Sequence, residues 1–143
     1  MEAGLIRFVD TSVLVEVVRG GSAARLRFRS ETYEFALVST VVLYELTIGA
    51  YLSDNPKRQL EKIRELIRVF EVAPFVESDA AVAAHLGSAL KRTGHSIGVL
   101  DTLIAGQALN RGWTVVTANA RHFSLIPGLA VEDWSRPVEP PGQ

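Results

Sequence analysis

Three acidic residues of this chain stand as the only ionisable groups in apolar stretches of the sequence. They are Asp10, Glu45 and Asp101. A buried charge is costly unless another group neutralises it, so isolated acids of this kind need a partner. Carboxylates that gather at one point repel one another, and a divalent cation such as Mg²⁺ or Mn²⁺ relieves that repulsion. The three residues therefore predict a metal site if the fold brings them together.

Glu45 is the clearest of the three acids. Its neighbours at three and four positions' distance are Val41, Val42, Ile48 and Gly49. Because residues at this spacing share one face of a helix, Glu45 interrupts a stripe that would otherwise be apolar and buried. A glutamate that merely faced solvent would not need to lie on this apolar face of the helix.

Apolar runs and helix-capping residues predict a chain that alternates short strands with helices. Strands are expected at residues 5–9, 35–38, 70–73, 113–117 and 130–132. Helices are expected after residues 10–12, as a short arginine-bearing segment after 20–21, from 39 to about 52, from 55 to about 70, from 78 to 94, and from 101 to 112. Alternation over the whole length predicts an α/β fold whose parallel sheet is covered by helices on both faces.

Two of the polar candidates follow expected strands. Asp10 comes directly after the first strand, and Asn119 lies two residues beyond Thr117, which ends a later one. In an open parallel sheet, the carboxyl ends of the strands line the ligand crevice. If Glu45 and Asp101 also point into that crevice, three carboxylates and one amide converge there. Such a set of oxygen ligands suits Mg²⁺ or Mn²⁺.

Each candidate also has an ordinary structural interpretation. Asp10 and Asp101 stand near helix starts, where aspartate is a favoured N-cap. An ion pair with an arginine of the cluster Arg25, Arg27 and Arg29 would account for Glu45 equally well. Asn119 alone is most simply a turn residue. The metal-site hypothesis therefore depends on the four residues together.

Composition excludes several other kinds of site. The chain has no cysteine, which rules out disulfides, thiolate metal sites and cysteine nucleophiles. His85, His95 and His122 have neither metal-type spacing nor the partners of a Ser-His-Asp triad. Glycine-rich phosphate loops are also missing from the sequence. A formal net charge of −1 gives no broad cationic field, so any contact with RNA must be local.

The length of 143 residues predicts one domain. The N-terminus lacks the basic and apolar pattern of a secretory signal, and the apolar stretch 36–53 carries Glu45 at its centre, which argues against a membrane span. We therefore expect a cytoplasmic protein without membrane contact.

Several segments, in this order and spacing, resemble the PIN-domain toxins of the VapC type. They are VDTS at 9–12, YEL at 44–46, IGVLDTLIA at 97–105, VTANARHF at 116–123 and IPGLAVEDW at 126–134. The resemblance runs from about Ile6 to Trp134 and is carried by the order of the segments, since no single one is specific.

The resemblance implies a three-layer α/β/α fold around a central, mostly parallel sheet of four to five strands. It implies a nuclease domain over residues 1–136, and we expect a disordered tail at 137–143. Asp10, Glu45 and Asp101 match the family's metal-binding acids, the same residues that isolation singles out. Where the family often has a fourth acid, this chain has Asn119 and His122, so the number of metal ions stays open.

The implied activity is that of a metal-dependent endoribonuclease, the toxin of a type II toxin–antitoxin system. Within it, Asp10 and Asp101 would hold the main Mg²⁺ or Mn²⁺ ion, Glu45 would position that ion or the attacking water, and Asn119 would orient a ligand or phosphate. Thr11 and Thr117 would offer supporting hydroxyls. The resemblance further implies a homodimer, an RNA substrate such as a transfer RNA, and a VapB-type antitoxin that blocks the groove.

Two other functions share part of this pattern. A response-regulator receiver also places acids at strand ends, but it needs an acidic pair before the first helix and a lysine after a late strand. Asp10 has no acidic neighbour, and residues 114–119 contain no lysine. A catalytically weak RNA- or protein-binding module of the same fold remains the main alternative, and metal-dependent cleavage would separate it from an enzyme.

Overall fold

The fold is built around a five-stranded sheet, seen in a computed structural model that describes residues 5–19 and 36–135. All four strand pairings are parallel, and the strand order is β3-β2-β1-β4-β5. The strands are β1 (Arg7–Val9), β2 (Ala36–Ser39), β3 (Glu71–Ala73), β4 (Thr114–Thr117) and β5 (Val131–Asp133). Each lies within two residues of its expected place, and the expected α/β fold is confirmed.

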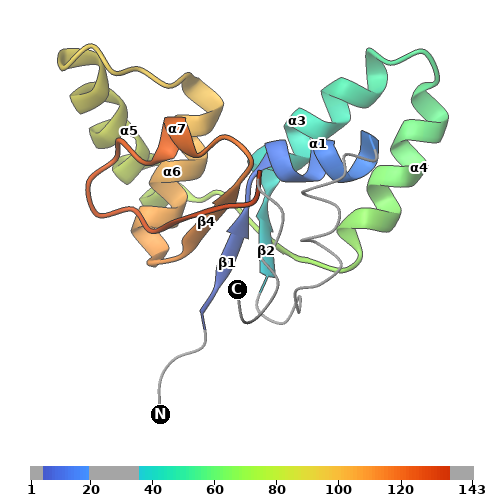
Figure 1. The fold of residues 1–143 in the computed structure, drawn as a ribbon, viewed down its shortest axis with the longest axis horizontal. Helices are drawn as coiled ribbons and strands as arrows, with labels where there is room; N and C mark the ends of the chain where they lie inside the picture. Colours follow the sequence, from blue (N-terminus) through green and yellow to red (C-terminus); the bar gives the residue numbers. More distant parts are fainter. Residues whose placement is uncertain (1–4, 20–35, 136–143) are drawn as a thin grey trace, which may run out of the picture.

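The helices form two groups on either side of the central strand (Figure 1). One group holds α1, α3 and α4, and the other holds α5, α6 and α7. Their bounds are α1 (Thr11–Arg19), α3 (Thr40–Tyr51), α4 (Pro56–Ile67), α5 (Glu77–Arg92), α6 (Val99–Arg111) and α7 (Ala120–Phe123). The arginine-bearing helix expected after residues 20–21, and the tail from 137, lie outside the described residues.

The capping residues predicted from the sequence do lie at the ends of these helices. The Ser39 hydroxyl accepts a hydrogen bond from the Val41 N–H at the start of α3, and the Asn55 side chain accepts one from the Arg58 N–H at the start of α4. Gly112 takes the left-handed conformation that closes α6, with φ 71°.

Two helix starts were placed wrongly, and one short helix was missed. Helix α5 begins at Glu77 instead of Ser78 or Asp79, because Asp79 caps it from within the first turn by accepting a bond from the Val76 N–H. Helix α6 begins at Val99, two residues before Asp101. The four-residue α7 has no apolar repeat long enough to predict it.

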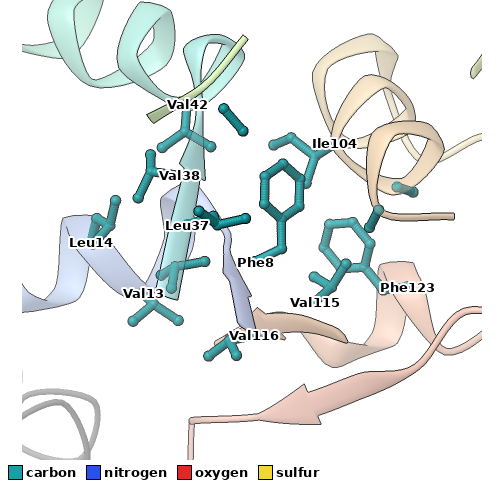
Figure 2. Close-up of a cluster of buried hydrophobic side chains, with 14 of the residues drawn as sticks. Phe8, Val13, Leu14, Leu37, Val38, Val42, Ile104, Val115, Val116 and Phe123 are labelled. Atoms are coloured by element: carbon teal, nitrogen blue, oxygen red, sulfur yellow. The ribbon is translucent and has the colours of Figure 1, made fainter. Parts of the chain in front are cut away.

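The core lies between the sheet and the two groups of helices. Figure 2 shows Phe8, Leu37 and Val115 of the strands among apolar side chains of the helices. The helical partners that it labels are Val13, Leu14, Val42, Ile104 and Phe123. Because β1 is central, its side chains are buried on both faces, and its end is held in a fixed place.

Helices α5 and α6 approach each other closely at a glycine. A Cβ built on Gly106 would stand 2.5 Å from the Cα of Ala83, so only glycine fits there. Buried Gln107 ties α6 to the strands: the Ser39 hydroxyl donates to its side-chain oxygen at 2.6 Å, and its amide nitrogen donates to the Pro74 carbonyl at 3.2 Å. Helix α6 is therefore fixed against the strand ends.

In the part of the chain that the structure describes, no helix is long and apolar enough to cross a membrane.

Candidate metal centre

A hollow of about 310 Å³ opens at the carboxyl ends of β1 and β4. These two strands are neighbours on which the sheet order reverses, which is where open α/β sheets bind ligands. The hollow is lined by Asp10, Thr11, Ser12, Val15, Glu16, Glu45, Asp101 and Asn119. All four residues singled out in the sequence therefore lie around one space, although up to 109 positions separate them along the chain.

Asp10 forms the floor of the hollow and is only 3% exposed. Its backbone N–H still belongs to the sheet, donating to the Val116 carbonyl at 2.9 Å. Its Oδ2 accepts hydrogen bonds from the Ser12 hydroxyl at 2.8 Å and the Thr117 hydroxyl at 2.7 Å. Burial raises the pKa of Asp10 above its ordinary value, and the charge of Asp101 adds to this, while the two hydroxyl bonds work against it.

The hydroxyls that hold Asp10 are themselves held by the backbone after β4. The Ala118 N–H donates to the Ser12 hydroxyl oxygen, and the Asn119 N–H donates to that of Thr117, both at 2.9 Å. The carboxylate is thus oriented by groups whose own positions are fixed by the turn that leaves β4. Thr117 was expected to support the acids; the part played by Ser12 was not foreseen.

Glu45 reaches the hollow from α3. The Thr11 hydroxyl donates to its Oε1 at 2.7 Å, so the second expected supporting hydroxyl is also in contact with an acid. Burial raises the pKa of Glu45, and the charges of Asp10 and Asp101 raise it further. The alternative pairing with the arginines at 25, 27 and 29 lies outside the described residues.

Asp101 comes from the first turn of α6, on the other side of the hollow. It is not the cap of its helix, because the N-cap is Gly98, with φ 94°. Its Oδ2 lies 2.8 Å from Nδ1 of His122, which α7 carries. The same ring nitrogen lies 3.1 Å from the Asn119 side-chain nitrogen. Asn119 is therefore more than a turn residue, since its side chain belongs to this contact.

Two residues of the site were missed in the sequence. His122 was assigned to no site because α7 could not be foreseen. Glu16 lines the hollow from α1, and as an exposed acid on an amphipathic helix it looked like a solvated residue. Glu16 stands four residues after Ser12, on the same face of α1, but Ser12 was not foreseen as a site residue either, so this spacing gave no signal.

The donor set fits a hard divalent cation, since carboxylate and amide oxygens are the ligands that Mg²⁺ takes. The acids are close enough for Asp101 to raise the pKa of both Asp10 and Glu45. Within the described residues, no three carboxylate or imidazole side chains are arranged tightly enough to hold one ion as they stand. An ion shared by all three acids therefore requires their side chains to rotate inward.

Comparison with known proteins agrees with the fold. Residues 7–129 match the PIN domain family. The chain is 37% identical over 132 residues to the tRNA(fMet)-specific endonuclease VapC of Salmonella typhimurium, covering 91% of this chain and 99% of that one. It is 30% identical over 131 residues to ribonuclease VapC1 of Rickettsia felis, covering 90% and 94%.

Solved structures give the same result. A chain of the DNA-bound VapBC complex from Salmonella typhimurium superposes with a TM-score of 0.83 at 33% identity, covering 92% of this chain and 99% of that one. A chain of VapBC2 from Rickettsia felis, bound to a promoter fragment, also has a TM-score of 0.83, at 25% identity, with 91% and 99% covered. The chain therefore belongs to the PIN-domain family and, within it, to the VapC ribonucleases.

Proposed function

We propose that the hollow at the ends of β1 and β4 is a divalent-metal site at which this protein hydrolyses RNA phosphodiester bonds, as the toxin of a type II toxin–antitoxin pair. One observation carries the proposal: three acids and one amide from four separate segments line the same space. The raised pKa of Asp10 and of Glu45 supports it, because burial and then the charges of neighbouring acids disfavour the ionised forms, and a cation would stabilise them.

A bound Mg²⁺ or Mn²⁺ would supply positive charge to offset the carboxylates and the phosphate. Asp10 and Asp101 would hold it, Asp10 being oriented by the hydroxyls of Ser12 and Thr117. Glu45, held by Thr11, would accept a proton from the attacking water or bind the ion. The Asn119 amide would orient the phosphate.

The test is cleavage of RNA by purified protein with Mg²⁺ or Mn²⁺. We expect cleavage to stop in EDTA, and to fall by about 100-fold or more in Asp10→Asn and Asp101→Asn, because charge stabilisation at the reacting phosphate is lost. Asp54→Asn, at an exposed aspartate between α3 and α4, is the matched control and should cleave normally. Full cleavage in Asp10→Asn, or in EDTA, would reject the metal site.

Transfer RNA is the substrate that we propose. The similar VapC proteins of Shigella flexneri and Salmonella typhimurium are named as specific for tRNA(fMet). Such a substrate implies action in the cytoplasm. Cleavage of initiator transfer RNA should exceed that of an elongator transfer RNA of equal length under the same conditions, and equal rates would reject the specificity. If RNA is bound but never cleaved, the chain is a binding module.

We also propose a VapB-type antitoxin and a second copy of this chain as partners. The structures of similar proteins are VapBC complexes. An apolar groove between α5 and α6, with Val99 73% exposed at its edge, supports burial of that face against another subunit. Light scattering of the pure protein should give twice the chain mass, and co-expression with a VapB-type antitoxin should yield an inactive complex. A monomer, or an active complex, would reject the respective partner.

A further inference from the structure

We propose that His122 positions the Asp101 carboxylate for a divalent cation in the hollow by donating a hydrogen bond to its Oδ2. The inference rests on the proposed metal site and concerns how that site is completed. It begins with the contact between His122 Nδ1 and Asp101 Oδ2, at 2.8 Å.

The chemistry of the two groups sets the direction of this hydrogen bond. A carboxylate oxygen only accepts, so Nδ1 of His122 carries the proton and donates it. The same nitrogen cannot also accept a bond from the Asn119 NH₂ group, 3.1 Å away. Turning the Asn119 amide by half a rotation presents its oxygen instead, and oxygen and nitrogen of an amide can be exchanged in this way. His122 then holds both side chains through one N–H.

The position of His122 divides Asp101 into an outer and an inner oxygen. Asp101 lines the hollow, whereas His122 does not. Since Oδ2 faces the ring, Oδ1 is the oxygen that we assign to a cation in the hollow. The side chain of Asp101 is 23% exposed and that of His122 is 43% exposed, so without this bond the carboxylate would be free to turn towards solvent. Hydrogen bonds to metal-binding carboxylates set their orientation in this manner.

Calorimetric titration of the metal-free chain with Mn²⁺ tests this inference. His122→Ala should bind Mn²⁺ about 10–100-fold more weakly than the wild type does, the usual effect of losing a group that orients a ligand. His122→Asn places an N–H donor close to the position of Nδ1 and should restore the affinity. His85→Ala, at an exposed histidine of α5 outside the hollow, is the matched control and should bind as the wild type does.

Thermal unfolding in EDTA accompanies the titration. His122→Ala should unfold at the same temperature as the wild type, which separates positioning from a general structural role. Unchanged Mn²⁺ affinity in His122→Ala would overturn the inference. Asp10→Asn separates failure of the proposed metal site from failure of the role proposed for His122. If Asp10→Asn loses Mn²⁺ binding while His122→Ala keeps it, only the role of His122 is rejected. If Mn²⁺ binds neither the wild type nor any variant, the metal site itself fails.

Discussion

The Asp10 carboxylate is buried where β1 ends, and its hydrogen bonds do not fully offset the cost of removing its charge from water. Two hydroxyls donate to it, yet burial and the nearby charge of Asp101 keep its pKa above the ordinary value. A raised pKa means that the folded state binds the proton more tightly than the unfolded state does. The charged form of Asp10 is therefore a source of instability whenever no cation is present.

Replacing this carboxylate by its neutral isostere should stabilise the metal-free protein. We expect Asp10→Asn to unfold at higher denaturant in EDTA near neutral pH, by on the order of 1 kcal/mol, because a poorly compensated buried charge is removed. Stability of the wild type should fall as pH rises from 3.8 through the raised pKa of Asp10, and Glu45 acts in the same direction from 4.5. The stability of Asp10→Asn should fall less steeply with rising pH.

Denaturant titrations of both proteins between about pH 5 and about pH 8 measure this difference. Excess Mg²⁺ should reverse it, since an ion bound at 100 times its Kd adds about 2.7 kcal/mol to the wild type alone. If Asp10→Asn is the less stable protein in EDTA at the upper end of this range, the electrostatic account of Asp10 is wrong.

At the scale of elements, the position of Asp101 depends on how α6 packs against α5. The closest approach is at Gly106, where a Cβ would meet backbone atoms of Ala83 at 2.5 Å. Backbone cannot move aside as the end of a flexible side chain can, so any larger residue must push the helices apart. Since α6 carries Asp101, such a shift also changes the hollow.

Gly106→Ala should therefore reduce both stability and cleavage. Overpacking of this kind costs about 1–3 kcal/mol, which outweighs the gain of up to about 1 kcal/mol that alanine brings to a helix. Gly49→Ala in α3 is the matched control: its Cβ meets nothing within 4 Å, so it should be neutral or stabilising. Chemical denaturation and RNA cleavage of both variants provide the measurement; a stabilised Gly106→Ala would show that the helices can separate freely.

Asp79 joins the start of α5 to the end of α6 and is fully buried. It accepts bonds from the Val76 N–H, from Asn110 at 2.8 Å and from Arg111 at 3.1 Å. Burial alone would raise the pKa of Asp79, but the bonds from Arg111, Asn110 and Val76 outweigh it and lower the pKa below 3.8. The stability that it contributes is present above 3.8 and is lost as pH falls through the lowered folded value.

Asp79→Asn should destabilise the protein at neutral pH by about 2 kcal/mol or more, because the buried donors of Val76, Asn110 and Arg111 would face a neutral amide, a poorer acceptor than a carboxylate. The loss should shrink as the pH is lowered, since the wild type then loses the same charge. Unfolding of the two proteins at neutral and acidic pH would show whether the difference narrows. A constant difference would mean that shape, and not charge, is what Asp79 supplies.

The same elements show what local sequence can and cannot predict. Ser39, Asn55 and Gly112 mark helix ends through bonds within a few residues, so their roles are readable from neighbouring letters. Asp79 was misplaced because its acceptor role resembles that of an N-cap. His122 was noted where the family often has a fourth acid, but its contact with Asp101 was not predicted, because Asp101 stands 21 positions earlier and meets it only through tertiary packing.

For the whole molecule, the order of the strands in the sheet explains why the site residues could be predicted from the sequence while their arrangement in space could not. Isolation in apolar stretches identified Asp10, Glu45 and Asp101, and the parallel sheet placed Asn119 at the correct edge. The bond from Thr117 to Asp10 spans 107 positions, and no local pattern encodes such a contact. The expected order of strands along the chain is confirmed, whereas their order in the sheet was outside the reach of periodicity.

Net charge is also a property of the whole molecule, and it predicts how RNA binding responds to salt. With a formal charge of −1, the chain can engage few phosphates at once. A plot of log affinity against log salt concentration should have a slope no steeper than about −3, equivalent to about four phosphate contacts. The cleavage-deficient Asp10→Asn bound to a labelled transfer RNA is suited to this measurement. A slope of about −6 would reveal a wide basic surface instead.

Strand β4 lies directly beside β1, although β1 is the first strand made and β4 the fourth. During synthesis on the ribosome, the nascent chain thus carries Asp10 and Glu45 long before Thr117 and Asn119 emerge to complete their surroundings. A product that stops short of residue 114 lacks the strand beside which Asp10 is held. We therefore expect such a fragment to be inert, because its Asp10 carboxylate lacks the Thr117 hydroxyl that orients it.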